Sequence, residues 1–343
     1  MNPKSVVIEG KNLNIGYRRG KREETVHHHL NFSLYRGELT CLLGANGAGK
    51  STLLRTLAAV QPSLSGEISL LGKSLSGYSP KERSRAIGIV LTDKTQAGGL
   101  SVRELLALGR QPHTGFFGRL SREDNEKIEH ALQAVGIADK ASKYTAELSD
   151  GERQKVMIAK ALVQECPLIL LDEPTAFLDV VSRIEIMTLL HRLAGEEQRA
   201  ILMSTHDIEQ ALVLGDRLWL MKKGEGLECG VTEDLILAHK MDNLFPHDDI
   251  RFDSMHGIYS PAVKGNKCIY LEATDETLRH WTQNAMNRNG YLCLGLSDAA
   301  REQCLPVVNV QAANRLVVTL GTTSEIYSSF ESLLASPLLA GKL

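Results

Sequence analysis

The chain has 343 residues, of which 43% are hydrophobic and 23% are charged, and its formal net charge at pH 7 is −2. This composition predicts an ordinary globular protein of about two domains, without the run of ~20 apolar residues that a membrane-spanning helix needs. The near-neutral charge gives no general attraction to nucleic acid, so we expect no nucleic-acid partner. The N-terminus lacks the apolar core of a signal peptide, and six scattered cysteines without C-x-x-C spacing fit a reducing cytosol.

Strand-like and helix-like segments alternate over residues 1–240, which predicts an α/β domain with a mainly parallel sheet. Buried strands are expected at 39–44, 167–171 and 199–204. The first of them precedes a helix at 51–60 whose leucines share one face. A charged, mostly helical stretch at about 101–150 interrupts the alternation, and we interpret it as an inserted helical subdomain.

Residues 245–343 have a different pattern. Short strands are expected at DIRFDS, GIYSPA, KCIYLEA, YLCLGL, PVVNVQ and RLVVTLG, and amphipathic helices at 275–289 and 323–335. This mixture predicts a small α+β domain, of which the ferredoxin-like fold is one form. It has no glycine-rich phosphate-binding motif and no pair of acids at the end of a buried strand, so we expect a regulatory or dimer-stabilising domain, with a passive extension as the alternative.

The strongest motif is Gly44-x-x-x-x-Gly49-Lys50-Ser51, between an expected strand and an expected helix. Glycines let a backbone wrap closely around phosphates with its N–H groups pointing inward. Lys50 is expected to neutralise the β- and γ-phosphates, and the Ser51 hydroxyl to bind Mg²⁺. The predicted nucleotide-binding residues of this segment are Gly44, Asn46, Gly47, Ala48, Gly49, Lys50, Ser51 and Thr52.

Two acids, Asp172 and Glu173, end the apolar run PLILL at the carboxyl edge of the expected sheet, where α/β proteins bind ligands. Asp172 is predicted to hold Mg²⁺, and Glu173 to polarise the attacking water. His206 follows a third strand in MSTHD, where its imidazole could reach a γ-phosphate. The alternatives are that the acids only cap the next element and that His206 is structural.

The segment LSDGE begins a helix, with Ser149 as N-cap and Glu152 as its capping-box partner. A helix N-terminus is also a good anion site. A second conspicuous segment is HHH at 27–29, which suggests a metal site. Because adjacent strand residues point to opposite faces, three in a row cannot converge on one ion. We therefore do not assign a metal to this segment.

The segments GANGAGKST, LSDGE, LLDEPTAFLD and STHD, in this order and spacing, resemble the nucleotide-binding subunit of an ATP-binding-cassette (ABC) transporter. The resemblance covers about residues 5–238 and implies a P-loop ATPase that uses ATP and Mg²⁺ as a head-to-tail homodimer. Ser149 and Gly151 of one chain would then contact the γ-phosphate held by Lys50 of the other. The family usually has glycine where Asp150 stands. A carboxylate there repels a triphosphate unless it points to solvent or meets a cation.

The same resemblance assigns roles to isolated residues. Tyr17 resembles the aromatic that stacks on adenine, although a tyrosine at a strand end is as often a core residue. Asp179 resembles the aspartate of the loop that links the two active sites. Where the family usually places a Mg²⁺-sensing Gln, this chain has Thr92, with Gln96 four residues on; we favour Thr92 as the metal ligand.

The segment LGRQPH at 108–113 resembles importers of iron–siderophore complexes, haem or cobalamin. The implied function is an ATPase that lies peripherally at the cytoplasmic face of the inner membrane. Integral membrane permease subunits would dock on the helical subdomain and the 92–100 loop, and a solute-binding protein would deliver the solute on the far side. One alternative is a soluble ABC ATPase with a non-transport role such as iron–sulfur assembly. The other is a nucleic-acid-acting cassette, for which tandem cassettes, a coiled coil or a basic patch would be expected.

Overall fold

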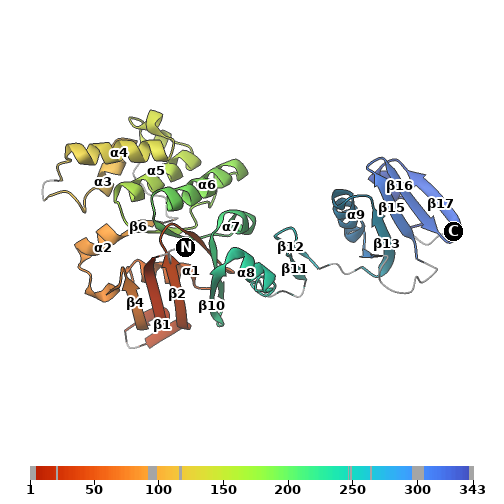
Figure 1. Cartoon of the computed structure of the whole chain (residues 1–343), viewed down its shortest axis with the longest axis horizontal. Coiled ribbons are helices and arrows are strands. Elements are labelled where there is room, and N and C mark those ends of the chain that lie inside the picture. The colour runs from red at the N-terminus through yellow and green to blue at the C-terminus, as the bar shows by residue number, and fades with distance from the viewer. Residues whose placement is uncertain are drawn as a thin grey trace. The chain divides into compact units, whose positions relative to one another are not determined.

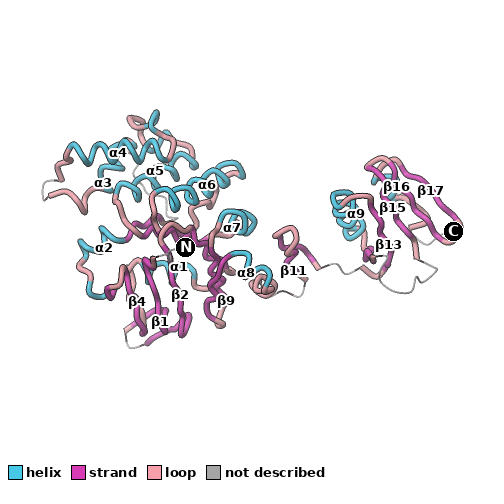
Figure 2. Tube along the Cα trace, viewed as in Figure 1, coloured by secondary structure: helices cyan, strands magenta, loops and turns pink. Residues whose placement is uncertain are grey.

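The computed structural model describes residues 5–20, 22–91, 99–115, 118–245, 247, 249–262, 265–295 and 305–339. The chain divides into two compact units, and Figures 1 and 2 show the helices and strands of each. The first unit comprises residues 1–246 and 252–259, and the second comprises 247–251 and 260–343. Among the described residues, none of the helices combines the length and apolar character that crossing a membrane requires.

A six-stranded sheet in the order β10-β9-β3-β8-β7-β6 forms the centre of the first unit. Its strands are β3 (Leu39–Leu43), β6 (Ile87–Val90), β7 (Leu168–Asp172), β8 (Ala200–Ser204), β9 (Arg217–Lys222) and β10 (Gly226–Val231). All pairings are parallel except that of β10 with β9 at one edge. This confirms the α/β fold with a mainly parallel sheet.

Both faces of this sheet are covered, which explains why its strands are continuous apolar runs. Successive side chains of a strand point to opposite faces. Accordingly, Leu168 and Leu170 of β7 join one buried cluster, and Ile169 and Leu171 join another. Each fully buried leucine or isoleucine contributes about 2 kcal/mol to folding through apolar burial.

One face is covered by α1 (Lys50–Leu57) and by an antiparallel sheet in the order β2-β1-β4-β5. The strands of that sheet are β1 (Val6–Arg19), β2 (Arg22–Tyr35), β4 (Ser65–Leu70) and β5 (Lys73–Ser74). The remaining short helices of the unit outside its helical subdomain are η1 (Leu75–Gly77), α2 (Pro80–Ala86), α7 (Ile208–Leu214) and α8 (Thr232–Leu237).

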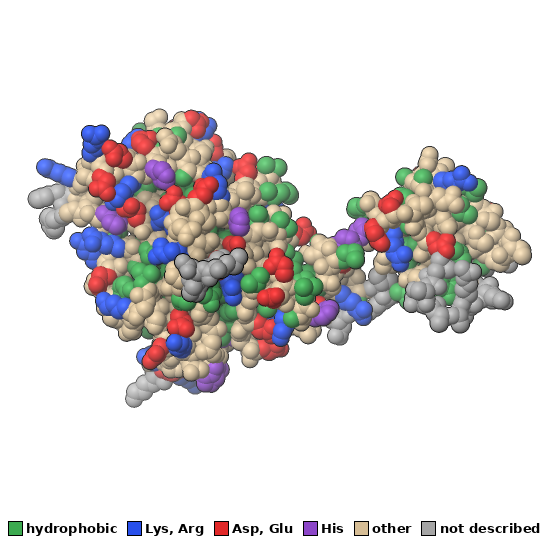
Figure 3. Space-filling view, in the orientation of Figure 1, with side chains coloured by type: hydrophobic (Ala, Val, Ile, Leu, Met, Phe, Trp, Pro, Cys, Tyr) green, Lys and Arg blue, Asp and Glu red, His purple; other side chains and the backbone are tan. Residues whose placement is uncertain are grey.

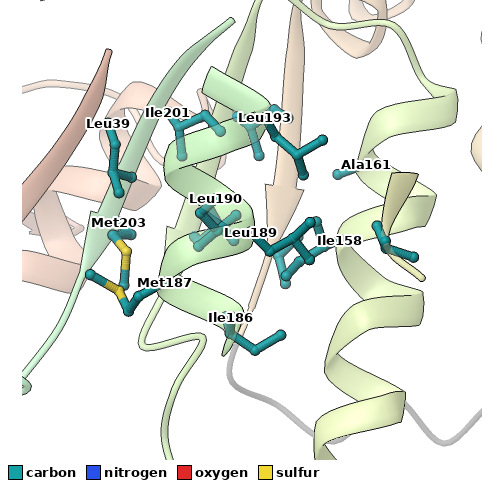
Figure 4. Close-up of a cluster of buried hydrophobic side chains, with 14 of the residues drawn as sticks. Leu39, Ile158, Ala161, Ile186, Met187, Leu189, Leu190, Leu193, Ile201 and Met203 are labelled. Carbon is teal, nitrogen blue, oxygen red and sulfur yellow. The ribbon is translucent and has the colours of Figure 1, made fainter. Parts of the chain in front are cut away.

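The other face is covered by α6 (Val180–Glu196) and by the helical subdomain. In Figure 4, Met187 and Leu190 of α6 lie beside strand residues such as Met203, whereas Leu189 is directed toward Ile158 of α5. The subdomain consists of α3 (Val102–Gly109), α4 (Arg122–Ala134), η2 (Ala138–Lys140), η3 (Thr145–Glu147) and α5 (Asp150–Val163). Because α5 packs against α3 and α4, it belongs to the subdomain and extends it past residue 150.

A short hairpin, β11 (Ile250–Asp253) and β12 (Ile258–Pro261), follows the cassette. Its residues 252–259 pack with the first unit, although the sequence pattern places them in the second domain. The Tyr259 hydroxyl donates to the Met241 carbonyl at 2.5 Å, and its ring meets Phe245 edge-on.

The second unit holds a five-stranded sheet in the order β14-β13-β15-β16-β17. Its elements are β13 (Lys267–Ala273), α9 (Glu276–Arg288), β14 (Tyr291–Leu294), β15 (Val307–Ala312), β16 (Arg315–Leu320), β17 (Thr323–Tyr327) and α10 (Phe330–Leu334). β13 runs parallel to both of its neighbours, and β15, β16 and β17 are antiparallel. The α+β character is confirmed, but the described order of elements is not the βαββαβ order of a ferredoxin-like fold.

The helix expected at 323–335 is wrong in its first half. Thr323, Ile326 and Tyr327 favour a strand, and they pair with β16 as β17. The helix begins only after Ser329, whose hydroxyl accepts from the Ser332 N–H.

On the face of the first unit that Figure 3 shows, acidic and basic side chains are interspersed. This distribution agrees with the formal net charge of −2. It offers no extended basic patch on that face.

Candidate active site

Residues 44–49 connect the end of β3 to the start of α1 and have the backbone geometry of a tight loop. Gly47 and Gly49 have φ angles of 74° and 102°, which favour glycine. A Cβ on Gly44 would lie 2.4 Å from the Met221 carbonyl oxygen. Close packing and left-handed backbone therefore require glycine at these positions.

Lys50 is buried at the start of α1, with 6% of its surface exposed. Its Nζ donates to the carbonyl oxygens of Gly44 at 2.8 Å and Ala45 at 3.3 Å. Burial lowers the pKa of Lys50, and the nearby carboxylates of Glu173 and Asp172 oppose that shift. The loop, the ammonium group and the acid pair are thus brought together, as the motifs predict.

Asp172 lies at the end of β7, beside the first turn of α1. Its Oδ1 accepts from the Ser51 hydroxyl at 3.3 Å and from the Ser204 hydroxyl at 2.6 Å. Ser204 Oγ also accepts from the Glu173 N–H at 2.9 Å. Ser204 is not among the predicted site residues; its position at the end of β8, two residues before His206, is the signal that points to it. The hydroxyl and carboxylate oxygens together fit a Mg²⁺ ion, which prefers oxygen ligands.

Glu173 and His206 meet at the same edge of the sheet. Glu173 Oε1 and His206 Nε2 are 2.7 Å apart, and both side chains are about one-third to two-fifths exposed. Glu173 has a φ angle of 49°, an uncommon conformation that is found at functional sites. A carboxylate held in this way can accept a proton from a water molecule.

Asp179 caps the N-terminus of α6. Its carboxylate accepts from the Ser182 N–H and from the Ser182 hydroxyl, both at 2.9 Å, and the first of these bonds lowers its pKa most. Arg183 donates to the Leu178 carbonyl at 3.0 Å and pairs with Asp207 at 2.8 Å. Arg183 therefore connects the turn that contains Asp179 to Asp207, the residue after His206.

The start of α5 confirms the capping box. The Ser149 hydroxyl accepts from the Glu152 N–H, and the Glu152 carboxylate accepts from the Ser149 N–H at 2.9 Å. Asp150 pairs with Arg153 at 2.8 Å, so this carboxylate does meet a cation. A Cβ on Gly151 would lie 3.1 Å from Ser182 Oγ, which places the starts of α5 and α6 side by side. Within the described ranges, no hydrogen bond joins Ser149 or Gly151 to residues 44–52.

Tyr17 lies on β1, is 38% exposed, and shares a 2.8 Å hydrogen bond between its hydroxyl and that of Thr52. This contact places the ring beside the phosphate loop, and adenine stacking stays a prediction. Thr92 and the alternative Gln96 lie outside the described residues.

One site contact comes from the HHH segment. His27 is buried, and its Nε2 lies 2.6 Å from the Ala48 carbonyl oxygen in the phosphate loop. His27 was not among the predicted site residues. In the described part of the chain, no group of three His, Cys, Asp or Glu residues could hold a metal ion.

The LGRQPH segment holds the helical subdomain together. A Cβ on Gly109 would lie 2.6 Å from the Lys160 carbonyl oxygen, so α3 and α5 pack closely there. The buried Arg110 pairs with Asp124 of α4 at 2.8 Å, and His113 Nε2 lies 2.9 Å from the Gln164 carbonyl oxygen.

Comparison with known proteins agrees with this geometry. A family model described as ABC transporter matches residues 27–176. The chain is 37% identical over 241 residues to the iron(3+)-hydroxamate import ATP-binding protein FhuC of Bacillus subtilis (strain 168). This alignment covers 70% of this chain and 88% of FhuC. It belongs to the ABC transporter ATP-binding proteins.

Two further similarities extend this result. The ABC protein is 35% identical to the ferric enterobactin transport ATP-binding protein FepC of Escherichia coli (strain K12), over 69% of this chain and 86% of FepC. The dimeric structure of MJ0796, a bacterial ABC transporter cassette, matches 66% of this chain and 98% of MJ0796 with a TM-score of 0.57 and 27% identity. The predicted ABC ATPase is therefore confirmed as an ATP-binding, ATP-hydrolysing subunit of an importer. Cassettes of this family form dimers and work with membrane permease subunits.

Proposed function

We propose that this ABC ATPase energises the uptake of an iron(III) chelate through a membrane permease. The observation that carries the ATPase mechanism is that Lys50, Asp172, Glu173 and His206 meet at one sheet edge. The solute class is supported by FhuC and FepC, whose names specify iron(3+)-hydroxamate and ferric enterobactin. The names of these two relatives do not favour the iron–sulfur assembly role.

The reaction would proceed by positioning and charge stabilisation. Lys50 and the N–H groups of residues 44–52 would bind the phosphates, and His206 would contact the γ-phosphate. Glu173 would accept a proton from water as the water oxygen bonds to the γ-phosphorus and the bond to the bridging oxygen breaks, giving ADP and phosphate. Ser51 and Asp172, with Thr92, would hold Mg²⁺, which would neutralise phosphate charge.

The second half of each site would come from another copy of the chain. The N–H groups that begin α5 would bind the γ-phosphate of the partner together with Ser149 and Gly151. Exposed apolar residues flank Asp179: Phe177 is 86% exposed, Val180 64% and Val181 66%. Such a surface supports a head-to-tail homodimer that buries this turn.

The permease would dock in a cleft of about 940 Å³ between α2 and the ends of α3 and α5. Ile89 and Leu108 line it and are 37% and 42% exposed, and Arg83 and Lys160 add positive charge. These features suit a permease helix with an apolar face and an acidic residue. The ATPase would then lie peripherally at the cytoplasmic face of the membrane, with a solute-binding protein delivering the chelate on the far side.

Uptake measurements test the solute class. Cells that lack the chain should lose ATP-dependent accumulation of ⁵⁵Fe-labelled ferric hydroxamate, and the wild-type gene should restore it. Loss of cobalamin or haem uptake with normal iron-chelate uptake would assign another solute. For the docking surface, Leu108→Glu should abolish co-purification with the permease and leave ATP binding intact, whereas Leu237→Glu, at an exposed position on α8, should change neither.

A further inference from the structure

We propose that His27 is a positioning residue that aims the phosphate-loop backbone at ATP. The inference rests on the proposed assignment of residues 44–52 to phosphate binding. It does not depend on the transported solute. His27 comes from β2, a strand with no motif of the family, and it contacts the loop from within the protein.

The hydrogen bond itself fixes the direction of donation. A carbonyl oxygen can only accept, so the Nε2 of His27, 2.6 Å from the Ala48 oxygen, carries the proton and donates it. His27 and Ala48 are 2% and 1% exposed. Water therefore cannot easily replace the imidazole, and a buried carbonyl without a partner is costly.

Peptide geometry converts this bond into an effect on the site. The peptide unit is planar and trans, so the Ala48 carbonyl and the Gly49 N–H point in opposite directions. Holding that carbonyl against His27 turns the Gly49 N–H the other way, into the loop. Gly49 is the N-cap of α1, where N–H groups without an intrahelical partner bind anions.

Steric contact reinforces the hydrogen bond. Gly49 has a φ angle of 102°, and a Cβ there would lie 3.1 Å from His27 Cδ2 and 2.8 Å from Val26 Cγ1. β2 therefore packs directly against the peptide that His27 holds. The Lys50 ammonium group also bonds loop carbonyls, those of Gly44 and Ala45, but its predicted role takes it to the phosphates.

The test removes the donor and then restores it. His27→Leu fills the buried position with an apolar side chain that has no N–H to donate. His27→Gln restores a donor, because its amide nitrogen lies the same number of bonds from Cα as the Nε2 of histidine. His28→Leu is the matched control, because His28 is exposed on the same strand. The readouts are the ATP dissociation constant by calorimetry, kcat and KM, and the thermal midpoint without nucleotide.

We expect His27→Leu to raise the Kd and KM for ATP about tenfold, the effect of leaving one buried hydrogen-bond partner unsatisfied, with kcat changed less than about twofold. His27→Gln should bring the Kd back to within about threefold of wild type, and His28→Leu should match wild type. The inference is overturned if folded His27→Leu binds ATP as wild type does, or if His27→Gln restores the thermal midpoint but not the Kd.

A Lys50→Ala variant distinguishes failure of the phosphate-loop assignment from failure of the positioning role of His27. If Lys50→Ala binds ATP normally, the phosphate-loop assignment itself fails. If Lys50→Ala loses binding while His27→Leu does not, only the positioning role of His27 fails. If His27→Leu does not fold, His27→Gln and His27→Asn decide the matter. The shorter Asn amide is expected to bind ATP at least threefold more weakly than Gln, and equal binding by the two contradicts the inference.

Discussion

Glu173 Oε1 and His206 Nε2 are hydrogen-bonded at 2.7 Å. The Glu173 carboxylate lies at the same edge of the sheet as Lys50. Replacing Glu173 with Gln removes the proton acceptor and leaves the phosphate loop intact. Turnover should fall by about 10²-fold or more, the usual effect of removing a general base, while the ATP Kd stays within about threefold. Phosphate release and calorimetry measure the two quantities, and sedimentation should show an ATP-bound dimer. Hydrolysis at the wild-type rate would remove Glu173 from the mechanism.

Asp150 stands where the family usually has glycine, and its carboxylate pairs with Arg153 at 2.8 Å. Because this guanidinium already offsets the negative charge, Asp150→Asn should strengthen ATP-dependent dimerisation by less than about threefold, the range of an exposed ion pair. Sedimentation in the Glu173→Gln background measures the dimer constant at low and high salt. A tenfold gain at low salt would show that the carboxylate repels the partner's triphosphate despite Arg153.

At the scale of elements, the helical subdomain depends on the buried pair of Arg110 from the end of α3 and Asp124 from α4, 2.8 Å apart. Burial by itself would raise the pKa of Asp124, but hydrogen bonds from the backbone and hydroxyl of Ser121 and from Arg110 outweigh it and lower the pKa to about 2. Asp124→Asn removes one of the two carboxylates that pair with the guanidinium and leaves only the half-exposed Glu165, 2.8 Å from Arg110. The free energy of unfolding should fall by about 2 kcal/mol at pH 7, the contribution of a hydrogen bond between charged groups, because Glu165 still pairs with Arg110.

The pH dependence follows from the direction of that shift. A carboxylate whose pKa is lower in the folded state stabilises the fold above its unfolded pKa, which is ~4, and loses this effect as pH falls through the folded value. The difference between wild type and Asp124→Asn in urea unfolding should therefore be constant from pH 7 to 5 and shrink below pH 4. Glu126→Gln, on the exposed side of α4, is the control. A difference that does not vary with pH would mean that packing, not charge, explains the loss.

At the scale of the whole molecule, the boundary of the first unit can be tested by truncation. A chain of residues 1–262 keeps the hairpin that packs on the cassette through Tyr259, and a chain of residues 1–246 loses it. We expect 1–262 to bind ATP within about twofold of the full chain. The shorter chain should melt about 5 °C lower, because it loses about 2 kcal/mol of aromatic burial.

The hairpin also lies beside the active site. Gly257, Ile258 and Tyr259 line the same cavity of about 360 Å³ as His206. The 1–246 chain should therefore also hydrolyse ATP more slowly than 1–262. Equal melting temperature and equal turnover of the two truncated chains would show that the hairpin is not part of the catalytic unit. Failure of folded 1–262 to bind ATP would instead extend that unit into residues 263–343.

Short-range sequence signals were sufficient for much of this protein. Apolar runs predicted β3, β7 and β8, because strands buried on both faces must be apolar throughout. The spacing of Gly44, Gly49 and Lys50 predicted the loop, because only glycine tolerates its backbone angles and close contacts. The capping box at Ser149 was readable for the same local reason.

Contacts between distant segments could not be read in this way. The apolar spacing of residues 323–335 predicted one helix, yet residues 323–327 pair with β16 as a strand, because a neighbouring strand edge offers hydrogen bonds that this spacing does not reveal. His27 bonds to Ala48 only because β2 packs against the phosphate loop in the folded chain. The sequence by itself determined most of the elements and the chemistry of the motifs, since both depend mainly on neighbours along the chain. The tertiary structure decided which side chains support that chemistry, since burial and hydrogen bonding join residues that are far apart in sequence.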